Sequence, residues 1–191
     1  NEIGAIEPVE EIGKIVKSFD PKILFHTDCI QAYGKLNCYP KKWKADMISV
    51  SGHKIHGPKG IGFIYIKNGT KIKPIIWGGN QQKGMRSGTE NVPGIAGLGK
   101  AAELIYENHE EKIAHIREIK EHFIKRVMEE IPDVKDNSGD APHVASISFL
   151  GVRSEVLLHA LEEREIYVSA GSACSSNKPE VSGTLKGIGL T

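Results

Sequence analysis

Residues 47–60 read MISVSGHKIHGPKG, and the first four form a short apolar run of the kind that predicts a buried β-strand. The run passes without a break into Lys54, which lies between small residues and a glycine-proline turn. A second apolar run, residues 23–26, ends beside Asp28. In an open α/β sheet, ligands collect at this end of the strands. The two runs therefore predict a ligand site near Asp28 and Lys54.

Helical and strand patterns alternate around this stretch. Residues 8–16 begin with proline and repeat apolar side chains at helical spacing, which predicts a helix. Residues 61–66 and 72–76 are further strand candidates, although Pro74 places the second at an edge or a bulge. Residues 92–105 keep a helical period. This alternation predicts an α/β fold with a mainly parallel sheet and crossover helices.

The pattern changes towards the C-terminus. A long, charged amphipathic helix is expected over about 110–130. After it, an alternating strand is expected over 144–149, a helix over 154–163 and a short strand over 166–168. These elements predict a smaller α+β unit that the long helix joins to the first part. The expected division of the chain is 1–108, 109–131 and 132–191.

Composition excludes several classes of function. The 191 residues carry 25 basic and 24 acidic side chains, a net charge of +1, which does not favour nucleic-acid binding. No apolar run approaches the ~18 residues that a membrane span needs. Three cysteines, Cys29, Cys38 and Cys174, lack the spacing of a disulfide framework or a zinc site. We therefore expect no nucleic acid, membrane or metal as partner, and a reducing, cytoplasmic setting.

Lys54 is a candidate nucleophile. A lysine is nucleophilic only when neutral, and a Schiff base with a carbonyl cofactor is a common use of that state. Ser51 and His53 can hold a phosphate group, and Asp28 can hold a protonated pyridine nitrogen, with Gln31 in reach of the same ring. The structural alternatives are a solvated loop lysine and a glutamine that hydrogen-bonds a helix start.

Four separated motifs occur in a familiar order. They are HTDCIQ at 26–31, SGHK at 51–54, RSGTEN at 86–91 and GSACSS at 171–176. Together they resemble the NifS/IscS-like cysteine desulfurases of the class V aminotransferases, over essentially the whole chain. The resemblance implies the fold of pyridoxal-phosphate-dependent transferases of the aspartate aminotransferase type. It makes 1–108 the second half of the cofactor-binding large domain, 109–131 a connecting helix and 132–191 part of the small domain.

The resemblance also implies roles for single residues. Lys54 would bond covalently to pyridoxal 5'-phosphate and act in catalysis with His53 and with Cys174, the nucleophile that becomes a persulfide. Thr89 would reach the cofactor phosphate of a neighbouring subunit, which implies a homodimer with shared active sites. The cofactor-binding positions that the resemblance implies are Asn1, Asp28, Gln31, Ser51, His53, Lys54 and Thr89.

The implied reaction converts L-cysteine to L-alanine and leaves the sulfur on Cys174, for delivery to a sulfur-acceptor or iron-sulfur scaffold protein. A cysteine in an exposed loop rich in glycine and serine suits this task, because its thiolate can travel to an acceptor. Two alternatives stay open. One is a selenocysteine lyase of the same family, and the other is a catalytically silent module that keeps the dimer and partner surfaces.

Some family features are missing from the 191 residues. The cofactor-stacking histidine and the phosphate-binding loop would precede Asn1, and the carboxylate-binding arginine would follow Thr191. We therefore expect an internal fragment that binds the cofactor poorly by itself and does not turn over cysteine. Arg86 and Arg153 are not assigned to the substrate carboxylate.

Overall fold

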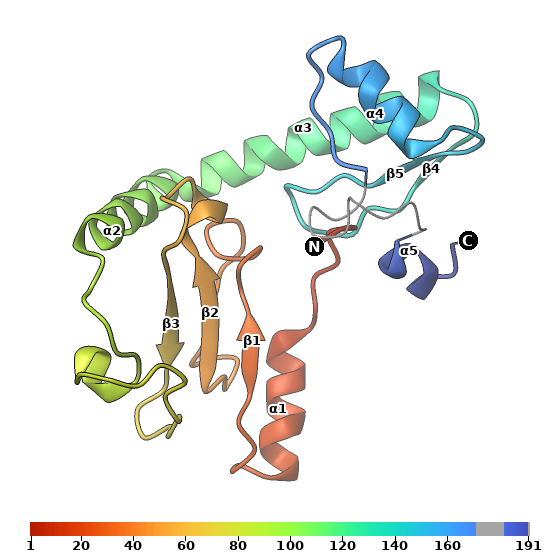
Figure 1. The fold of residues 1–191 in the computed structure, drawn as a ribbon. Helices are drawn as coiled ribbons and strands as arrows, with labels where there is room; N and C mark the ends of the chain where they lie inside the picture. The colour runs from red at the N-terminus through yellow and green to blue at the C-terminus, as the bar shows by residue number, and fades with distance from the viewer. Residues whose placement is uncertain (171–181, 191) are drawn as a thin grey trace. The chain divides into compact units, whose positions relative to one another are not determined.

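The computed structural model describes residues 1–170 and 182–190 (Figure 1). Cys174, the proposed sulfur carrier, lies outside the described residues. The chain divides into two compact units. We call Glu7–His109 the sheet unit, and Asn1–Ile6 together with Glu110–Thr191 the long-helix unit.

Three strands form the sheet of the sheet unit. They are β1 (His26–Asp28), β2 (Met47–Ser51) and β3 (Gly62–Ile66), in the spatial order β1-β2-β3. β1 and β2 are parallel, whereas β3 runs antiparallel to β2. The sheet is mixed rather than mainly parallel, because residues 52–61 are too few for the crossover of about a dozen or more residues that a parallel neighbour needs. The class is nevertheless α/β, as predicted.

The two faces of β2 differ in chemistry. Ile48 and Val50 are buried, whereas Ser49 and Ser51 are half-buried. Successive side chains of a strand point to opposite faces, so one face is apolar and the other carries the serines. The apolar face belongs to a core whose buried members are Cys29, Ala45, Ile48 and Val50. The sheet therefore has one face for packing and one face that is free for polar chemistry.

Helix α1 (Val9–Phe19) lies beside β1 (Figure 1) and begins directly after Pro8, in agreement with the predicted start. Its contact with the rest of the sheet unit depends on Gly13. A Cβ atom at this position would lie 1.9 Å from the Trp43 carbonyl oxygen and 3.0 Å from the Phe25 ring. Only a residue without a side chain allows the helix to come this close.

The helical turn η1 (Gly52–Ile55) connects β2 to β3, and the chain after β3 forms a second turn, η2 (Gln81–Gly84), and the longer helix α2 (Val92–Tyr106). α2 begins at the Asn91 side chain, which accepts a hydrogen bond from the Gly94 amide at 3.1 Å. Ile55 of η1 packs with Leu98 and Ala101 of α2 in a second core. The strand predicted over 72–76 is not formed, since proline removes a backbone donor there.

The long-helix unit contains most of α3 (His109–Glu130), the antiparallel pair β4 (Val134–Asp136) and β5 (Ile147–Phe149), α4 (Ser154–Glu162) and α5 (Gly183–Gly187). α3, α4 and β5 confirm predicted elements. The strand predicted over 166–168 is not formed, and β4 and α5 are additional elements. Both are very short, and periodicity carries little signal over three to five residues.

The first residues of the chain pack within the long-helix unit. The Ile3 carbonyl accepts a hydrogen bond from the Gly139 amide at 2.6 Å, and the Gly4 carbonyl accepts one from the Ala141 amide at 2.9 Å. Lys120 of α3 donates to the carbonyls of the same two loop residues, at 2.5 and 2.8 Å. Asn1–Ile6 is thus tied to the loop after β4, and the roles of the domains stay a prediction.

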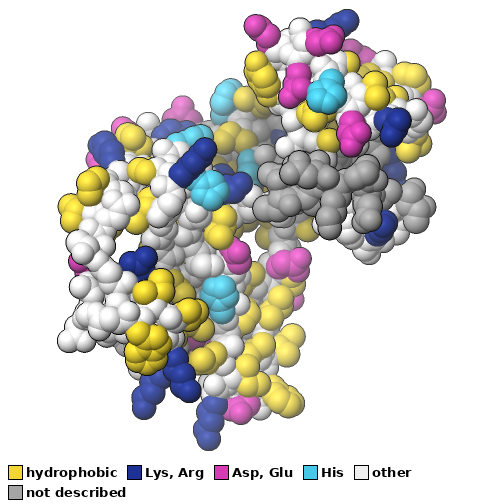
Figure 2. Space-filling view, viewed as in Figure 1, with side chains coloured by type: hydrophobic (Ala, Val, Ile, Leu, Met, Phe, Trp, Pro, Cys, Tyr) yellow, Lys and Arg dark blue, Asp and Glu magenta, His cyan; other side chains and the backbone are white. Residues whose placement is uncertain are grey.

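Large apolar side chains remain at the surface. Phe19, Ile75 and Trp77 are 85%, 94% and 77% exposed. Figure 2 shows hydrophobic side chains among the exposed atoms of both units. No helix in the described part of the chain combines the length and the apolar character that a membrane crossing requires.

Candidate active site

The carboxyl ends of β1 and β2 meet at one edge of the sheet. Asp28 ends β1 and is the register partner of Ser49, and Ser51 ends β2 two residues further on. Because register partners project to the same side, Asp28, Ser49 and Ser51 share one face. His26 Nε2 lies 3.2 Å from Ser49 Oγ on that face. At the carboxyl ends of the two strands, this polar face therefore carries the Asp28 carboxylate and the Ser51 hydroxyl.

Asp28 is oriented by the turn that follows it. Its Oδ1 accepts a hydrogen bond from the Ile30 amide at 2.8 Å, and its side chain is exposed. This bond holds one carboxylate oxygen in place and leaves the other for a ligand. Gln31, the next predicted cofactor residue, is half-buried in the same turn.

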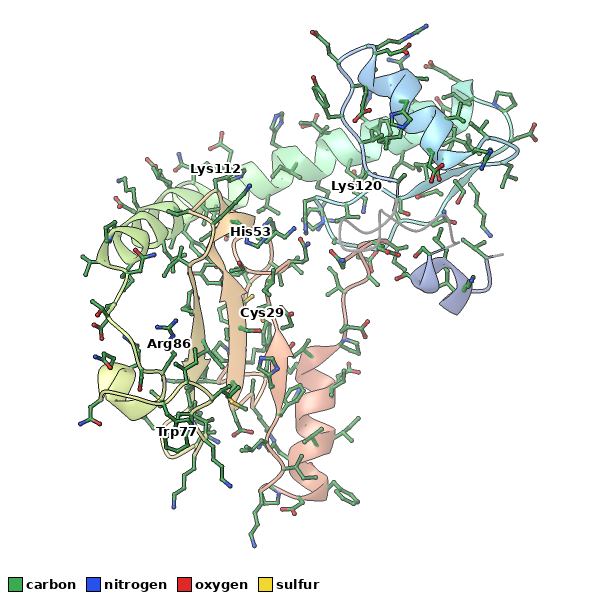
Figure 3. All side chains as sticks on the ribbon, in the orientation of Figure 1. Cys29, His53, Trp77, Arg86, Lys112 and Lys120 are labelled. Atoms are coloured by element: carbon green, nitrogen blue, oxygen red, sulfur yellow. The ribbon has the colours of Figure 1, made fainter. Side chains whose placement is uncertain are left out.

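Turn η1 carries His53 and Lys54 beyond β2. Ser51 Oγ and His53 Nδ1 are 2.7 Å apart, a hydrogen bond that fixes the imidazole against the strand end. Gly52 is buried, and a Cβ atom there would lie 3.0 Å from the Ile61 carbonyl oxygen and 3.2 Å from Leu98 Cδ1. The turn is therefore tightly enclosed by its neighbours, and Figure 3 shows His53 at the sheet edge.

Lys54 is half-buried, and across residues 1–170 and 182–190 no hydrogen bond or ion pair engages its amine. Its backbone carbonyl accepts a hydrogen bond from Lys35 Nζ at 2.5 Å. The structure thus brings four predicted site residues to one sheet edge, namely Asp28, Ser51, His53 and Lys54.

Two further predicted residues belong to other segments of the described chain. Thr89 is exposed in the loop before α2. Asn1 is part of the long-helix unit, whereas the four grouped residues are part of the sheet unit. The roles predicted for Asn1, Thr89 and Cys174 stay predictions, as do those of the grouped residues.

The two described cysteines belong to the core and not to the candidate site. Cys29 follows Asp28 directly, so its side chain points to the opposite, apolar face, where it is 2% exposed. A hydrogen bond with Cys38 lowers the pKa of the Cys29 thiol and, together with burial, raises the pKa of Cys38. Both thiols are free, in agreement with their interpretation as core residues.

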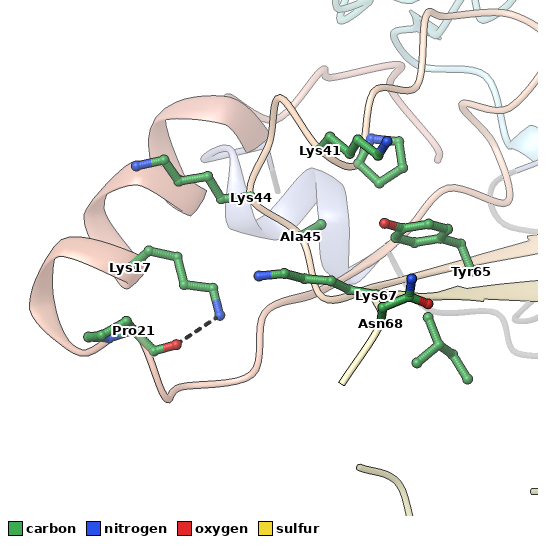
Figure 4. Close-up of a pocket in the computed structure, with 10 residues that line it drawn as sticks. Lys17, Pro21, Lys41, Lys44, Ala45, Tyr65, Lys67 and Asn68 are labelled. Carbon is green, nitrogen blue, oxygen red and sulfur yellow. Dashed lines mark hydrogen bonds between the residues drawn. The ribbon is translucent and has the colours of Figure 1, made fainter. Parts of the chain in front are cut away.

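A pocket of about 690 Å³ lies at the opposite end of β2, and four lysines contribute to its wall (Figure 4). Ile66 of this pocket is the register partner of Met47, the first residue of β2, whereas Ser51 is the last. The two ends of the strand are roughly 14 Å apart at the usual rise per residue. Lys17 Nζ donates to the Pro21 carbonyl in this pocket at 3.4 Å. The pocket is therefore separate from the candidate active site.

The family model described as Aminotransferase class-V matches residues 1–187. The chain belongs to the class-V aminotransferase family. Solved structures of related proteins share the fold of this chain. A NifS-like protein from Rickettsia africae is 33% identical, with a TM-score of 0.83 over 90% of this chain and 48% of that one. This likeness confirms the predicted fold.

Curated class-V relatives are similar along the whole chain. The cysteine desulfurase IscS of Clostridium botulinum is 44% identical over 195 residues, which cover 100% of this chain and 49% of the relative. The cysteine desulfurase IscS of Dictyoglomus turgidum is 43% identical, with coverage of 100% and 48%. The chain therefore spans about half the length of the curated relatives it matches.

One residue in contact with the candidate site, Lys35, is not marked by the sequence. Its partner is the carbonyl oxygen of Lys54, a backbone atom that every residue possesses. No residue type or spacing marks such a contact in a sequence. The only local signal is a lysine directly after Gly34 in a turn that is otherwise largely apolar.

Proposed function

We propose that the protein that contains this chain is a pyridoxal-phosphate-dependent cysteine desulfurase. One observation carries the proposal: Asp28, Ser51, His53 and Lys54 converge at one edge of the sheet. The similarity to proteins named cysteine desulfurase supports the choice of substrate. The proposed reaction converts L-cysteine to L-alanine and transfers the sulfur to an enzyme cysteine.

The residues at the sheet edge fit pyridoxal phosphate by their chemistry. The Asp28 carboxylate would hold a proton on the ring nitrogen, and Gln31 would reach the ring hydroxyl. Ser51 and His53 would donate hydrogen bonds to the phosphate. Lys54 offers an amine for the aldehyde. When bound, pyridoxal phosphate supplies an electron sink that stabilises negative charge on the substrate Cα.

The chain's own groups would perform the remaining steps. Lys54 would remove and return a proton at the substrate Cα. The Cys174 thiolate would then attack the substrate sulfur, forming an S–S bond as the Cβ–S bond breaks. The electron pair of the broken bond stays on the substrate carbon, which takes up a proton and becomes the methyl group of alanine. The sulfur remains on Cys174 as a persulfide.

A homodimer is part of this proposal. The loop between β3 and α2 carries both Thr89 and the strongly exposed Ile75 and Trp77. Exposed apolar side chains in one segment are typical of protein interfaces. This supports a neighbouring subunit that covers the loop and places Thr89 near the second active site. Asn1 would contribute a further cofactor contact.

The persulfide would pass to a sulfur-acceptor or iron-sulfur scaffold protein in the cytoplasm. The free thiols of Cys29 and Cys38 support a reducing compartment. In domain terms, 1–108 would be the second half of the cofactor-binding large domain, 109–131 the connecting helix and 132–191 part of the small domain.

The test uses the complete gene product, purified and supplied with pyridoxal phosphate. We expect yellow protein, cofactor trapped on Lys54 by borohydride reduction, and equal amounts of alanine and sulfur from cysteine. Lys54→Ala should lose all three. A colourless wild-type protein would contradict cofactor binding and favour a silent module. A strong preference for selenocysteine over cysteine would replace the proposed substrate.

A further inference from the structure

A second lysine, Lys35, holds the backbone of the candidate nucleophile. Lys35 Nζ donates a hydrogen bond to the Lys54 carbonyl oxygen at 2.5 Å, across 19 residues of sequence. Lys35 belongs to the turn that follows β1, and Lys54 belongs to the turn that follows β2. The bond therefore links the two turns that carry Asp28 and Lys54.

The turn after β1 is built so that Lys35 points towards Lys54. The Cys29 carbonyl accepts hydrogen bonds from the amides of Ala32 and Tyr33, at 3.0 and 2.8 Å. Gly34 then adopts a φ of +76°, and a Cβ atom there would lie 2.7 Å from Ile105 Cδ1. Both features require glycine. The backbone before Lys35 is thus held by the hydrogen bonds to the Cys29 carbonyl and by the contact of Gly34 with Ile105.

The Lys54 carbonyl, which Lys35 binds, lies near the end of the helical turn η1, where backbone carbonyls lack hydrogen-bond partners within the turn. η1 ends at Ile55, and His56 follows in the left-handed conformation with a φ of +63°. The last carbonyls of a helical turn have no partner within it, and a cationic side chain can supply one. Lys35 fills this role from a distant turn.

The position is unfavourable for a cation. Burial lowers the pKa of Lys35, and the charge of Lys54 lowers it further. A lysine with a long, flexible side chain also loses conformational entropy when its ammonium group is held at one atom. The hydrogen bond to the carbonyl opposes these costs.

We propose that Lys35 is a positioning residue for Lys54, because it holds the backbone segment from which the Lys54 amine projects. This inference rests on the proposed function, in which Lys54 captures the cofactor aldehyde. A small displacement of a reacting group lowers reaction rates strongly. Loss of the Lys35 bond should therefore slow the reaction of Lys54 more than it weakens the fold.

The test measures how fast pyridoxal phosphate is captured by the cofactor-free, complete gene product. Capture is followed by the rise of the absorbance of the bound cofactor, and borohydride trapping with mass spectrometry identifies Lys54 as the site. We expect Lys35→Met to lower the capture rate at least about fivefold, and Lys35→Arg to restore it to within about twofold. The same loss should appear in kcat for cysteine, with little change in KM.

Lys17→Met is the matched control. Lys17 is also half-buried and also donates to a carbonyl, that of Ile23 at 2.6 Å, but it pairs in addition with Asp46 and lies at the opposite end of the sheet. This variant should lower the midpoint of thermal unfolding and leave the capture rate unchanged. If Lys35→Met does not fold, Lys35→Gln is measured against the same criteria.

Three outcomes overturn the inference. They are an unchanged capture rate in Lys35→Met, a loss that Lys35→Arg does not reverse, and an equal loss in Lys17→Met that follows thermal stability. Failure of the wild-type protein to capture the cofactor is a different result, because it contradicts the proposed function itself.

Discussion

Asp28 and Ser49 are register partners in the parallel pairing of β1 with β2. This pairing places the end of β1 level with a residue two positions before Ser51, and so brings the Asp28 carboxylate to the edge at which η1 begins. A shift by one residue would turn Asp28 to the apolar face, because side chains alternate along a strand. The candidate active site therefore depends on one register.

Asp28→Asn should remove the charge that the cofactor ring would need in the proposed function, while keeping the local turn. Asparagine can accept the Ile30 amide bond as aspartate does. It cannot stabilise a protonated ring nitrogen, so we expect turnover of cysteine to fall at least about tenfold, the effect of losing a hydrogen bond to a charged group. Asp136→Asn, in a similar turn with the Ser138 amide, is the control and should keep full activity.

Cys174→Ala should abolish sulfur release and leave the absorbance of the bound cofactor intact, because in the proposed function the thiol would take part in sulfur transfer and not in cofactor binding. Absorbance spectra and alanine assays on the complete gene product test this. Cys38→Ala, which alters a thiol of the core, should retain sulfur transfer. Loss of the cofactor absorbance in Cys174→Ala would give Cys174 a structural role instead.

Asp46 should make the stability of the sheet unit pH-dependent. Burial opposes its charge, but hydrogen bonds from Lys17 and from the Phe25 amide outweigh burial and lower the pKa of Asp46. A lowered carboxyl pKa stabilises the fold above the ordinary value of about 3.9, and this contribution is lost as the pH falls through the folded-state pKa. Asp46→Asn should cost about 2 kcal/mol or more at pH 7 and progressively less below pH 4.

Thermal unfolding of both proteins between pH 7 and pH 3 measures the effect of Asp46. Glu10→Gln is the control, since Glu10 pairs with Lys14 at 2.6 Å and Lys42 at 2.8 Å at the surface. These exposed ion pairs should contribute far less, although they lower the pKa of Glu10 to about 2. An equal difference between Asp46→Asn and wild type at every pH would contradict the prediction.

Gly13→Ala should destabilise the sheet unit by about 1–3 kcal/mol, because the new methyl group would overlap the Trp43 carbonyl and push α1 away. Gly99→Ala is the matched control in α2, where a Cβ atom meets nothing within 4 Å. There we expect no loss, and a gain of up to about 1 kcal/mol from helix propensity. Denaturant unfolding of the two variants measures both effects, and equal stabilities would show that α1 does not need this contact.

Much of the fold follows from local pattern. The apolar run before Lys54 predicts β2, and helical periodicity predicts α1, α2 and α3, because burial of one face imposes a repeat on the residues themselves. The run predicted over 23–26 is observed as the strand β1, which ends two residues later, at Asp28. The polar residues His26 and Asp28 of this strand lie on the face of the site. The antiparallel direction of β3 cannot be predicted from such a repeat, because it depends on how the chain turns after η1.

The sequence by itself determined the class of fold, the family and the chemical types at the site, because residue identity and spacing encode burial and reactivity. Only the tertiary structure decided that Asp28 shares a sheet face with Ser51, that Gly52 lies close against Ile61 and Leu98, and that Lys35 holds the Lys54 carbonyl. These contacts join backbone atoms and residues far apart in the chain. Their energies depend on distance in space, which the order of residues does not specify.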